Sequence, residues 1–577
     1  MKNREIAAVF SRIADALDIK GEPAFKILAY RRAARILDEM AEDVAVLAAD
    51  NRLCDVEGIG DGLASKIVEY LKTGRMAKAD EAAKGLPAGL FDLLNVPGLG
   101  AKTVGLAFKA LGVAGLDDLR RVIADGSLAA LKGMGEKKAE NILKGIGTLE
   151  KGRERLLLGE AAEIAEEVIA ELKRAAGGGR IEAAGSLRRM RETIGDIDIL
   201  ASVRNGEAVI GALTGWNRVR RVLAAGDTKA SVLIEVGNGE RQVDLRFVEP
   251  DSFGAALQYF TGSKAHNVKL RGLAKDLGLK VNEYGVFRGE RKAAGREETD
   301  VYKALGLPWI PPELREDRGE IERAREGRLP TLIERDDIRG DLHCHTTASD
   351  GRLKLAELAD LMRAMGYGYA AVCDHSRSAR YAGGLTPERL KAQGAEIDAL
   401  NRKLKGFRIL KGTEVDILPD GTVDFPEPVL AGLDFVVASV HSSFKRDVTA
   451  RMIKALANPH VDMIGHPSGR LLSGREGYDV DLEKVIEAAR IHGKAMELNS
   501  HIDRLDLDDV HLRLAKDKGV PIGIGTDTHG ADGPAMIRFG LGTARRGWLE
   551  KTDVLNTLSA AGLARWRNKR TGEKRRP

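Results

Sequence analysis

Three aspartates in the middle of the sequence have the spacing of a site for divalent cations. Asp196 and Asp198 lie two residues apart in an apolar stretch typical of a strand, so their side chains point off the same face. Two carboxylates held this way repel each other unless cations lie between them, and hard oxygen ligands suit Mg²⁺. Asp244, in a second strand-like run, can supply a third carboxylate. Paired ions in such a site clamp the attacking and leaving oxygens of a phosphoryl transfer.

A short turn upstream of this pair carries groups that bind phosphate. It begins with Gly185 and Ser186 and ends with Arg188 and Arg189. The backbone N–H groups and the Ser186 hydroxyl can donate to a nucleoside triphosphate, and Arg189 can offset charge that develops on pyrophosphate. An Asp-x-Asp pair alone more often caps a turn, but the Gly-Ser turn before it favours the catalytic interpretation.

Imidazole and carboxylate groups form a second pattern near the end of the chain, where ten of the eleven histidines follow residue 340. His343 and His345 can converge on one metal at a strand end, and Asp527 with His529 repeats the spacing. Each candidate follows a short apolar run, at the end where barrel folds place their chemistry. Mixed nitrogen and oxygen ligands favour Zn²⁺, Mn²⁺ or iron over Mg²⁺. The candidate ligands are His343, His345, Asp350, His375, Glu414, His441, His466, Asp527 and His529.

Three segments in the first 150 residues share the pattern apolar-x-Gly-apolar-Gly followed by a helix. Glycines allow a tight turn that presents backbone N–H groups at a helix N-terminus, where phosphate binds favourably. Such hairpins hold the nucleic-acid backbone without reading bases, so three copies predict DNA binding. The glycine pairs are Gly58 and Gly60, Gly98 and Gly100, and Gly133 and Gly135, and Lys102 follows the second pair.

The composition indicates a multidomain globular protein. The chain has 577 residues, a formal net charge of +5, and only three cysteines, which lie far apart and fit a reducing, cytoplasmic compartment. No apolar run approaches the roughly 18 residues of a membrane-spanning helix. After residue 339, seven short apolar runs alternate with helical stretches, which predicts a parallel β/α barrel. The proline-rich, charged segment 313–338 predicts an extended linker.

Residues 1–330 resemble the family X DNA polymerases, the group that contains polymerase beta. The resemblance implies a helical region with helix-hairpin-helix motifs, then an α+β nucleotidyltransferase palm and a thumb. The implied domains are a lyase-like domain at 1–85, fingers at 86–150, a palm at 151–250 and a thumb at 251–312.

The resemblance also assigns roles to particular residues. Asp196, Asp198 and Asp244 match the metal-binding aspartates, where Mg²⁺ or Mn²⁺ is expected, and Asp244 is expected to activate the primer 3′-hydroxyl. The segment 259–263 resembles one that lines the incoming sugar and excludes a ribose 2′-hydroxyl. Arg271 matches a position that contacts the template strand. The implied nucleotide-binding residues are Gly185, Ser186, Arg189, Tyr259, Phe260, Gly262 and Asn267.

Lys66 occupies the place of the lysine that forms a Schiff base with an abasic-site sugar in the animal repair enzyme. Gly62 stands where that family has another lysine, and Phe25 stands where it has a histidine, although Lys26 and Tyr30 match. Contact of Lys66 with DNA phosphate is therefore the role we favour, and lyase activity is the alternative.

Residues 339–570 resemble a PHP domain (polymerase and histidinol phosphatase), and its nine-ligand pattern is complete here. A basic tail, 571–577, follows. The resemblance implies up to three ions, Zn²⁺ or Mn²⁺, that hydrolyse phosphoesters. The implied groups are His343, His345, Glu414 and Asp527; Glu414, His441 and His466; and Asp350, His375 and His529.

Together these features resemble the bacterial family X polymerase with a fused PHP domain. We expect a monomeric, cytoplasmic enzyme, nucleoid-associated through DNA and without a membrane partner. It would fill gaps in primed duplex DNA with deoxynucleoside triphosphates during base excision repair. The PHP domain would act as a 3′–5′ exonuclease, with abasic-site cleavage as a further activity. The alternatives are a nucleotidyltransferase with another acceptor such as RNA, a PHP domain that is a small-phosphoester phosphatase, and a DNA-binding scaffold with idle sites.

Overall fold

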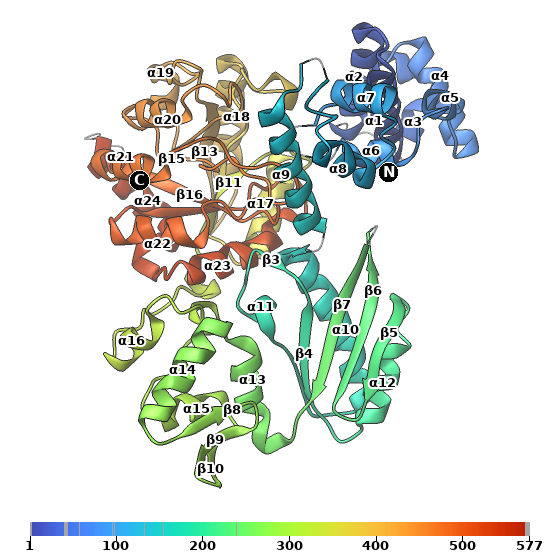
Figure 1. The fold of residues 1–577 in the computed structure, drawn as a ribbon. Coiled ribbons are helices and arrows are strands. Elements are labelled where there is room, and N and C mark those ends of the chain that lie inside the picture. Colours follow the sequence, from blue (N-terminus) through green and yellow to red (C-terminus); the bar gives the residue numbers. More distant parts are fainter. Residues whose placement is uncertain are drawn as a thin grey trace. The chain divides into compact units, whose positions relative to one another are not determined.

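The structure is a computed structural model that describes residues 3–39, 44–56, 58–94, 96, 99–131, 133–153, 155–237 and 239–571 (Figure 1). It forms two compact units, Met1–Arg153 and Glu154–Pro577. Across the described ranges, no helix has both the length and the apolar character needed to cross a membrane.

The described part of the first unit is helical. Apolar residues at helical spacing, such as Ile6, Phe10 and Ile13, are buried in a first cluster, and Leu90, Val104 and Leu119 belong to a second cluster. The helices are α1 (Asn3–Lys20), α2 (Ala24–Glu39), α3 (Val44–Ala49), α4 (Asp61–Thr73), α5 (Ala77–Ala83), α6 (Gly89–Leu93), α7 (Ala101–Leu111), α8 (Leu116–Ala124) and α9 (Glu136–Arg153).

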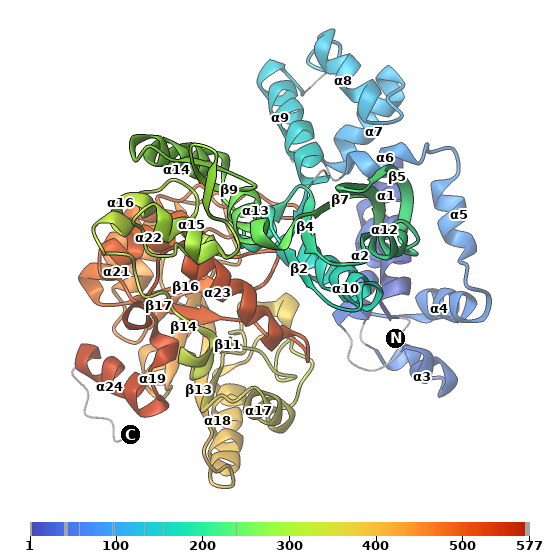
Figure 2. The ribbon, with the colours of Figure 1, turned by 90° about the horizontal axis from the view of Figure 1, so that it is seen from below.

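The predicted palm contains a five-stranded sheet in the order β2-β4-β7-β6-β5. β4 and β7 are parallel, and the other neighbours are antiparallel. Helices α10 and α12 lie side by side over one face (Figure 2). Ile197, Ile199 and Ala201 of β4 are buried in the cluster on that face, so Asp198 and Leu200 point to the other. The elements are α10 (Leu158–Ala176), β2 (Arg180–Ala183), α11 (Gly185–Arg188), β4 (Ile197–Ser202), α12 (Gly206–Thr214), β5 (Val219–Gly226), β6 (Lys229–Val236) and β7 (Gly239–Phe247), with the short pair β1 (Leu156–Leu157) and β3 (Thr193–Ile194).

The predicted thumb packs helices on a small three-stranded sheet. Leu270, Val286 and Tyr302 are fully or almost fully buried in its core. The elements are α13 (Phe253–Thr261), α14 (Lys264–Asp276), β8 (Lys280–Asn282), β9 (Gly285–Arg288), β10 (Arg291–Ala294) and α15 (Glu298–Ala304).

The segment predicted as an extended linker is folded instead. It contains helix α16 (Glu320–Arg325), and Ile321 and Leu332 join the thumb core. Arg315 is fully buried, where its guanidinium donates to the Ile310 carbonyl oxygen at 2.8 Å and pairs with Glu298. The charged composition suggested a solvated chain, but these charges pair with each other inside the protein.

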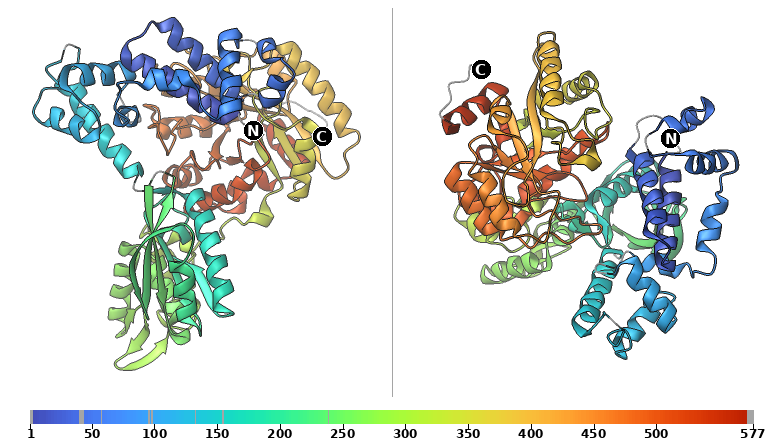
Figure 3. Two further views of the ribbon diagram at one scale, coloured as in Figure 1. Left: turned by 90° about the vertical axis from the view of Figure 1, so that its right-hand side faces the viewer. Right: turned by 90° about the horizontal axis from the view of Figure 1, so that it is seen from above.

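The C-terminal region is a seven-stranded parallel barrel, in the strand order β11 to β17, with helices outside the strands (Figure 3). A parallel bridge between Cys344 and Thr528 brings the two ends of the sheet together. The predicted fold class is therefore confirmed. The strands are β11 (Gly340–Cys344), β12 (Tyr369–Val372), β13 (Arg408–Asp416), β14 (Phe435–Ser439), β15 (Met463–Ile464), β16 (Ala495–Asn499) and β17 (Ile522–Gly525). The helices are α17 (Leu355–Ala364), α18 (Pro387–Asn401), α19 (Glu427–Ala431), α20 (Val448–Leu456), α21 (Leu482–His492), α22 (Asp509–Asp517), α23 (Ile537–Arg546) and α24 (Ala560–Thr571).

The palm and the barrel pack together within the second unit. Leu505 and Phe539, both from the barrel, are buried in the hydrophobic cluster of the palm. Gly159 of α10 lies against Ile502, and a Cβ at residue 159 would collide with that side chain. Apolar surface of the palm is thus buried by the barrel.

Candidate metal sites

Strands β4 and β7 bring the three aspartates together. Asp198 and Asp244 are register partners on these parallel strands, and Asp196 directly precedes β4. One carboxylate oxygen from each residue lies within 4.8 Å of the others. Gly185 adopts a φ of +63°, and a Cβ there would collide with the Asp198 carboxylate. The turn therefore needs glycine so that Asp198 can lie against its backbone.

The electrostatics of this cluster suit a divalent cation. Burial, followed by repulsion from Asp196 and Asp244, raises the pKa of Asp198 to about 7. Burial also acts to raise the pKa of Asp244, but the Asp244 carboxylate accepts hydrogen bonds from Ser231 and Gln242 and faces Lys229. These groups lower its pKa. Because the ligand set is oxygen only and carries excess negative charge, it fits Mg²⁺ or Mn²⁺.

The turn that is predicted to bind phosphate forms helix α11 and the residue after it. Ser186 is half-buried on α11. Arg188 forms two hydrogen bonds with the Glu298 carboxylate of the thumb, at 2.7 and 3.0 Å. Arg189 donates from Nη1 to the Thr261 carbonyl oxygen at 2.7 Å and from Nε to Glu316 at 3.0 Å. The turn therefore lies at the junction of palm and thumb.

The segment predicted to line the incoming sugar ends helix α13. The Tyr259 and Phe260 rings meet edge to face, with centroids 5.2 Å apart. The Asn267 side-chain amide donates to the carbonyl oxygens of Tyr259 at 2.7 Å and Gly262 at 3.1 Å, which fixes the end of the helix. Arg271 is exposed on α14, and its Nε donates to the Asn267 carbonyl oxygen at 3.3 Å.

The glycine hairpins lie directly before helices α4, α7 and α9. Gly58, Gly60, Gly100, Gly133 and Gly135 are exposed, whereas the apolar residue between each pair is buried, so the backbone of each turn faces outward. Lys102 is exposed in the first turn of α7. Gly98 lies outside the described residues, as does the tail after residue 571. Lys66 is half-buried on α4 and donates to the Gly62 carbonyl oxygen at 2.6 Å.

The nine candidate ligands of the barrel meet at the carboxyl ends of its strands, as the sequence predicts. Glu414 lies at the centre, with Oε1 2.8 Å from Nε2 of His466 and 3.3 Å from Nε2 of His441. Its Oε2 lies 2.9 Å from Nδ1 of His375. Asp350 lies 3.3 Å from Nε2 of both His375 and His529, and Asp527 lies 3.2 Å from Nε2 of His345. His343 places Nε2 3.7 Å from Glu414.

Buried ring nitrogens show that this cage fits metal ions. Nε2 of His343 and Nε2 of His345 are buried and form no hydrogen bond with any part of the chain that the structure describes. Buried ring nitrogens without a hydrogen-bond partner, beside carboxylates, are typical of the ligands of a metal site. The groups that converge are His345, Asp350, His375 and His529; His343, His345 and Asp527; and His375, Glu414 and His441. His345 and His375 each belong to two of these groups. The ligands therefore form one connected cage, whereas the resemblance implies three groups in which only Glu414 is shared.

Sequence reasoning missed the residues that orient these ligands. Glu497 Oε1 lies 2.6 Å from Nδ1 of His343, and its Oε2 accepts from the His466 backbone N–H at 2.6 Å. Asp416 lies 2.7 Å from Nδ1 of His441. Such carboxylates fix the tautomer and ring orientation of metal-binding histidines. The sequence does carry one signal for Glu497: it is a charged residue inside an apolar, strand-like run, which indicates a buried carboxylate with a partner.

Two further side chains lie beside the cage. Tyr381 is 42% exposed, and its ring centroid is 6.2 Å from the ring centroids of both His375 and His441. Arg504 lies 3.7 Å from Asp527, and its buried Nη1 has no hydrogen-bond partner among the described residues. An aromatic face and a guanidinium at the edge of a metal cage can contact a base and a phosphate.

The palm with its aspartate cluster, joined to a barrel with a metal-binding cage, defines a phosphoryl-transfer protein with two candidate sites. Family models of the DNA polymerase beta thumb, the helix-hairpin-helix domain and the SAM-like helix-hairpin-helix tandem match residues 256–316, 1–76 and 90–148. The chain is 40% identical to DNA polymerase/3'-5' exonuclease PolX of Bacillus subtilis, over 97% of this chain and 98% of that protein. The chain therefore belongs to the family X DNA polymerases.

Two other relatives match smaller shares of the chain. DNA polymerase lambda of Rattus norvegicus is 28% identical over 54% of this chain and 56% of its own length. A probable phosphatase of Thermoanaerobacter is 31% identical over 38% of this chain and 89% of its own length.

Proposed function

We propose that this protein is a DNA repair polymerase that fills gaps in duplex DNA and trims 3′ ends with its barrel. The observation that carries the proposal is the register pairing of Asp198 and Asp244 beside the Gly185 turn, in the same chain as a complete imidazole and carboxylate cage. Each site on its own would support one phosphoryl-transfer reaction. Their presence in one chain supports synthesis and hydrolysis on the same DNA.

In the polymerase site, Asp196, Asp198 and Asp244 would hold Mg²⁺ or Mn²⁺. Ions bound there supply electrostatic stabilisation of the transferred phosphoryl group. We assign the triphosphate to Ser186 and Arg189, and the primer 3′-hydroxyl to Asp244. Tyr259, Phe260 and Gly262 would line the sugar of the incoming nucleotide, with Asn267 fixing their backbone, and Arg271 would contact the template strand.

In the barrel, the nine ligands would hold Zn²⁺ or Mn²⁺, in up to three positions. Ions bound there supply activation of water for attack on a phosphodiester. Tyr381 would stack on the terminal base, and Arg504 would bind the scissile phosphate. Cleavage at abasic sites is a second reaction that the same groups could perform.

The exposed glycine turns support DNA binding. Each turn presents peptide N–H groups at a helix N-terminus, and these groups can bind the phosphates of the DNA backbone. Lys66 we assign to a phosphate contact, with deoxyribose-phosphate lyase activity as the alternative. We place the enzyme in the cytoplasm, as a monomer bound to DNA in base excision repair.

One experiment tests the proposal directly. A 5′-labelled primer in a single-nucleotide gap is incubated with Mg²⁺ or Mn²⁺, with and without deoxynucleoside triphosphates. We expect extension by one nucleotide with triphosphates and shortening from the 3′ end without them. The absence of extension with either ion would contradict the polymerase assignment.

A second candidate for the barrel is a phosphatase of small phosphomonoesters. The likeness to probable phosphatases over most of their own length favours it. Release of inorganic phosphate from a free monoester, with the labelled 3′ end left intact, would support this candidate over the exonuclease.

A further inference from the structure

Helix α23 of the barrel ends beside the phosphate-binding turn of the palm. Its last residue, Arg546, has only 3% of its side chain exposed. Its Nη1 donates to the carbonyl oxygen of Arg189 at 2.8 Å and to Oε1 of Glu316 at 2.9 Å. Its Nη2 donates to Asp509 of α22 at 2.6 Å. One buried guanidinium thus joins the barrel to the palm arginine that is predicted to bind triphosphate.

Glu316 couples the two arginines. Its Oε1 accepts from Nε of Arg189 at 3.0 Å as well as from Arg546. Burial acts to raise the pKa of Glu316, but the guanidiniums of Arg189 and Arg546 outweigh burial and hold its pKa below the ordinary value. The carboxylate therefore stays ionised between two cations, and each cation limits the positions available to it.

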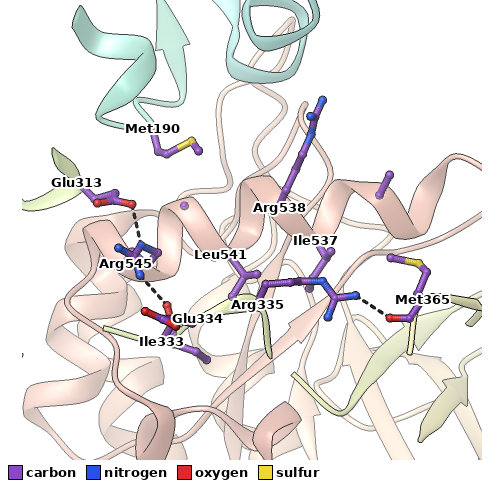
Figure 4. A pocket seen from close by; sticks show the side chains of 12 residues that line it. Met190, Glu313, Ile333, Glu334, Arg335, Met365, Ile537, Arg538, Leu541 and Arg545 are labelled. Atoms are coloured by element: carbon purple, nitrogen blue, oxygen red, sulfur yellow. Dashed lines mark hydrogen bonds and ion pairs between the residues drawn. The ribbon is translucent and has the colours of Figure 1, made fainter. Parts of the chain in front are cut away.

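Packing fixes the same turn from its other end. Met190 has a φ of 53°, and its side chain lies against Gly542 of α23, where a Cβ would come within 2.8 Å of the methionine Cγ. Figure 4 shows Met190 facing α23, beside a cavity of about 560 Å³ that Leu541 and Arg545 help to line. Because residue 542 is glycine, the palm turn can lie directly on helix α23 of the barrel.

We propose that Arg546 is a positioning residue for nucleotide binding, through which the barrel holds Arg189 in place for the triphosphate. This inference rests on the proposed role of Arg189 in synthesis. Arg189 uses Nε and Nη1 for Glu316 and the Thr261 carbonyl, and within the described chain its Nη2 donates to no group. That edge of the guanidinium remains for a phosphate oxygen. Preorganisation of such a group lowers the free energy lost when the nucleotide binds.

The test is steady-state gap filling by the full-length protein with Arg546→Met and Arg546→Lys. We expect Arg546→Met to raise the KM for the incoming nucleotide about tenfold with little change in kcat, since one charged hydrogen-bond network is lost. Lysine has a single ammonium group and cannot reach Arg189, Glu316 and Asp509 together, so Arg546→Lys should raise KM by a smaller factor. Trimming of 3′ ends should remain unchanged in both, which also reports that the protein is folded.

Arg538→Met is the matched control, because Arg538 also extends from α23 to the palm but pairs with Glu166, away from the turn. It should leave KM unchanged. Arg189→Met alone and combined with Arg546→Met completes a double-mutant cycle. If Arg546 acts through Arg189, the double variant should have the KM of Arg189→Met.

The outcomes distinguish the positioning role of Arg546 from the proposed role of Arg189. A raised KM for Arg189→Met with an unchanged KM for both Arg546 variants would overturn the positioning role alone, as would multiplicative effects in the double variant. An unchanged KM for Arg189→Met would overturn both the proposed role of Arg189 and this inference. If Arg546→Met does not fold, the Arg546→Lys result decides.

Discussion

Glu497 on β16 lies 2.6 Å from Nδ1 of His343 on β11. Both groups are fully buried. Burial acts to lower the pKa of His343, but Glu497, Glu414 and Asp527 outweigh it and raise the pKa well above its ordinary value. The same carboxylates make the ring more basic, and when Nδ1 of His343 donates to Glu497, a metal that takes the place of the Nε2 proton is bound by a stronger ligand. Glu497 therefore orients a ligand from outside the cage.

We predict that Glu497→Gln weakens metal binding by the barrel about 10- to 100-fold. The amide keeps the shape of the side chain but loses the charge that makes His343 a stronger ligand. Competition with a chelator, followed by metal analysis, measures the affinity. The control is Glu483→Gln, because Glu483 is exposed on α21. Equal metal retention by both variants would show that Glu497 has no such role.

Gly185→Ala tests the close approach of the turn to Asp198. A methyl group at residue 185 would collide with the Asp198 carboxylate. We expect the kcat/KM of gap filling to fall about 100-fold, because displacement of a catalytic group by about 1 Å has effects of this size. Gly211→Ala in α12 has open space around it and should be neutral. Normal synthesis by Gly185→Ala would contradict the placement of Asp198.

Tyr381→Ala should reduce 3′ trimming of DNA about tenfold, because base stacking on an aromatic ring is worth about 1–3 kcal/mol. Tyr381→Phe keeps the aromatic face and should retain most of the activity. Glycerol 3-phosphate has no aromatic ring to stack on Tyr381, so the rate of its hydrolysis should be similar in all three proteins. A loss in Tyr381→Phe as large as that in Tyr381→Ala would point to the hydroxyl instead of the ring.

Glu298 predicts a pH dependence of stability. Burial acts to raise its pKa, but Arg315 and Arg188 outweigh burial and lower it to about 2. Because the folded-state pKa lies below the unfolded value of about 4.5, the stabilisation is fully present above pH 4.5 and is lost as pH falls toward 2. The full contribution is about 3 kcal/mol.

Unfolding by urea from pH 7 to pH 3 measures this contribution. At pH 7, Glu298→Gln should have a lower free energy of unfolding than the natural protein. The difference between the two free energies should become smaller below pH 4.5. Glu297→Gln is the control, since Glu297 is half-exposed and pairs with Arg180 at the surface. A constant difference across the pH range would refute the assignment to Glu298.

The sequence predicted the parts of the fold that follow from local patterns. Alternation in the run that contains Asp198 predicted a strand, and seven apolar runs predicted the seven strands of the barrel. The spacing of His343 and His345 predicted convergence because strand geometry fixes which side chains share a face. Each of these predictions depends on periodicity within a single short segment.

Relationships between distant segments were beyond such reasoning. Glu497 lies 154 residues from His343, and Arg546 lies 357 residues from Arg189. Only tertiary packing brings them together. The segment 313–338 was predicted as extended for the same reason: the partners of its charges, such as Glu298 for Arg315, lie elsewhere in the chain.

The central claim is that two separate metal sites act on the same DNA, and one gapped duplex with a 5′ label tests it. Asp198→Ala should abolish extension and leave 3′ shortening intact, whereas His343→Ala should abolish shortening and leave extension intact. Both variants should show the circular dichroism and melting transition of the natural protein. Loss of both activities in either folded variant would contradict the claim.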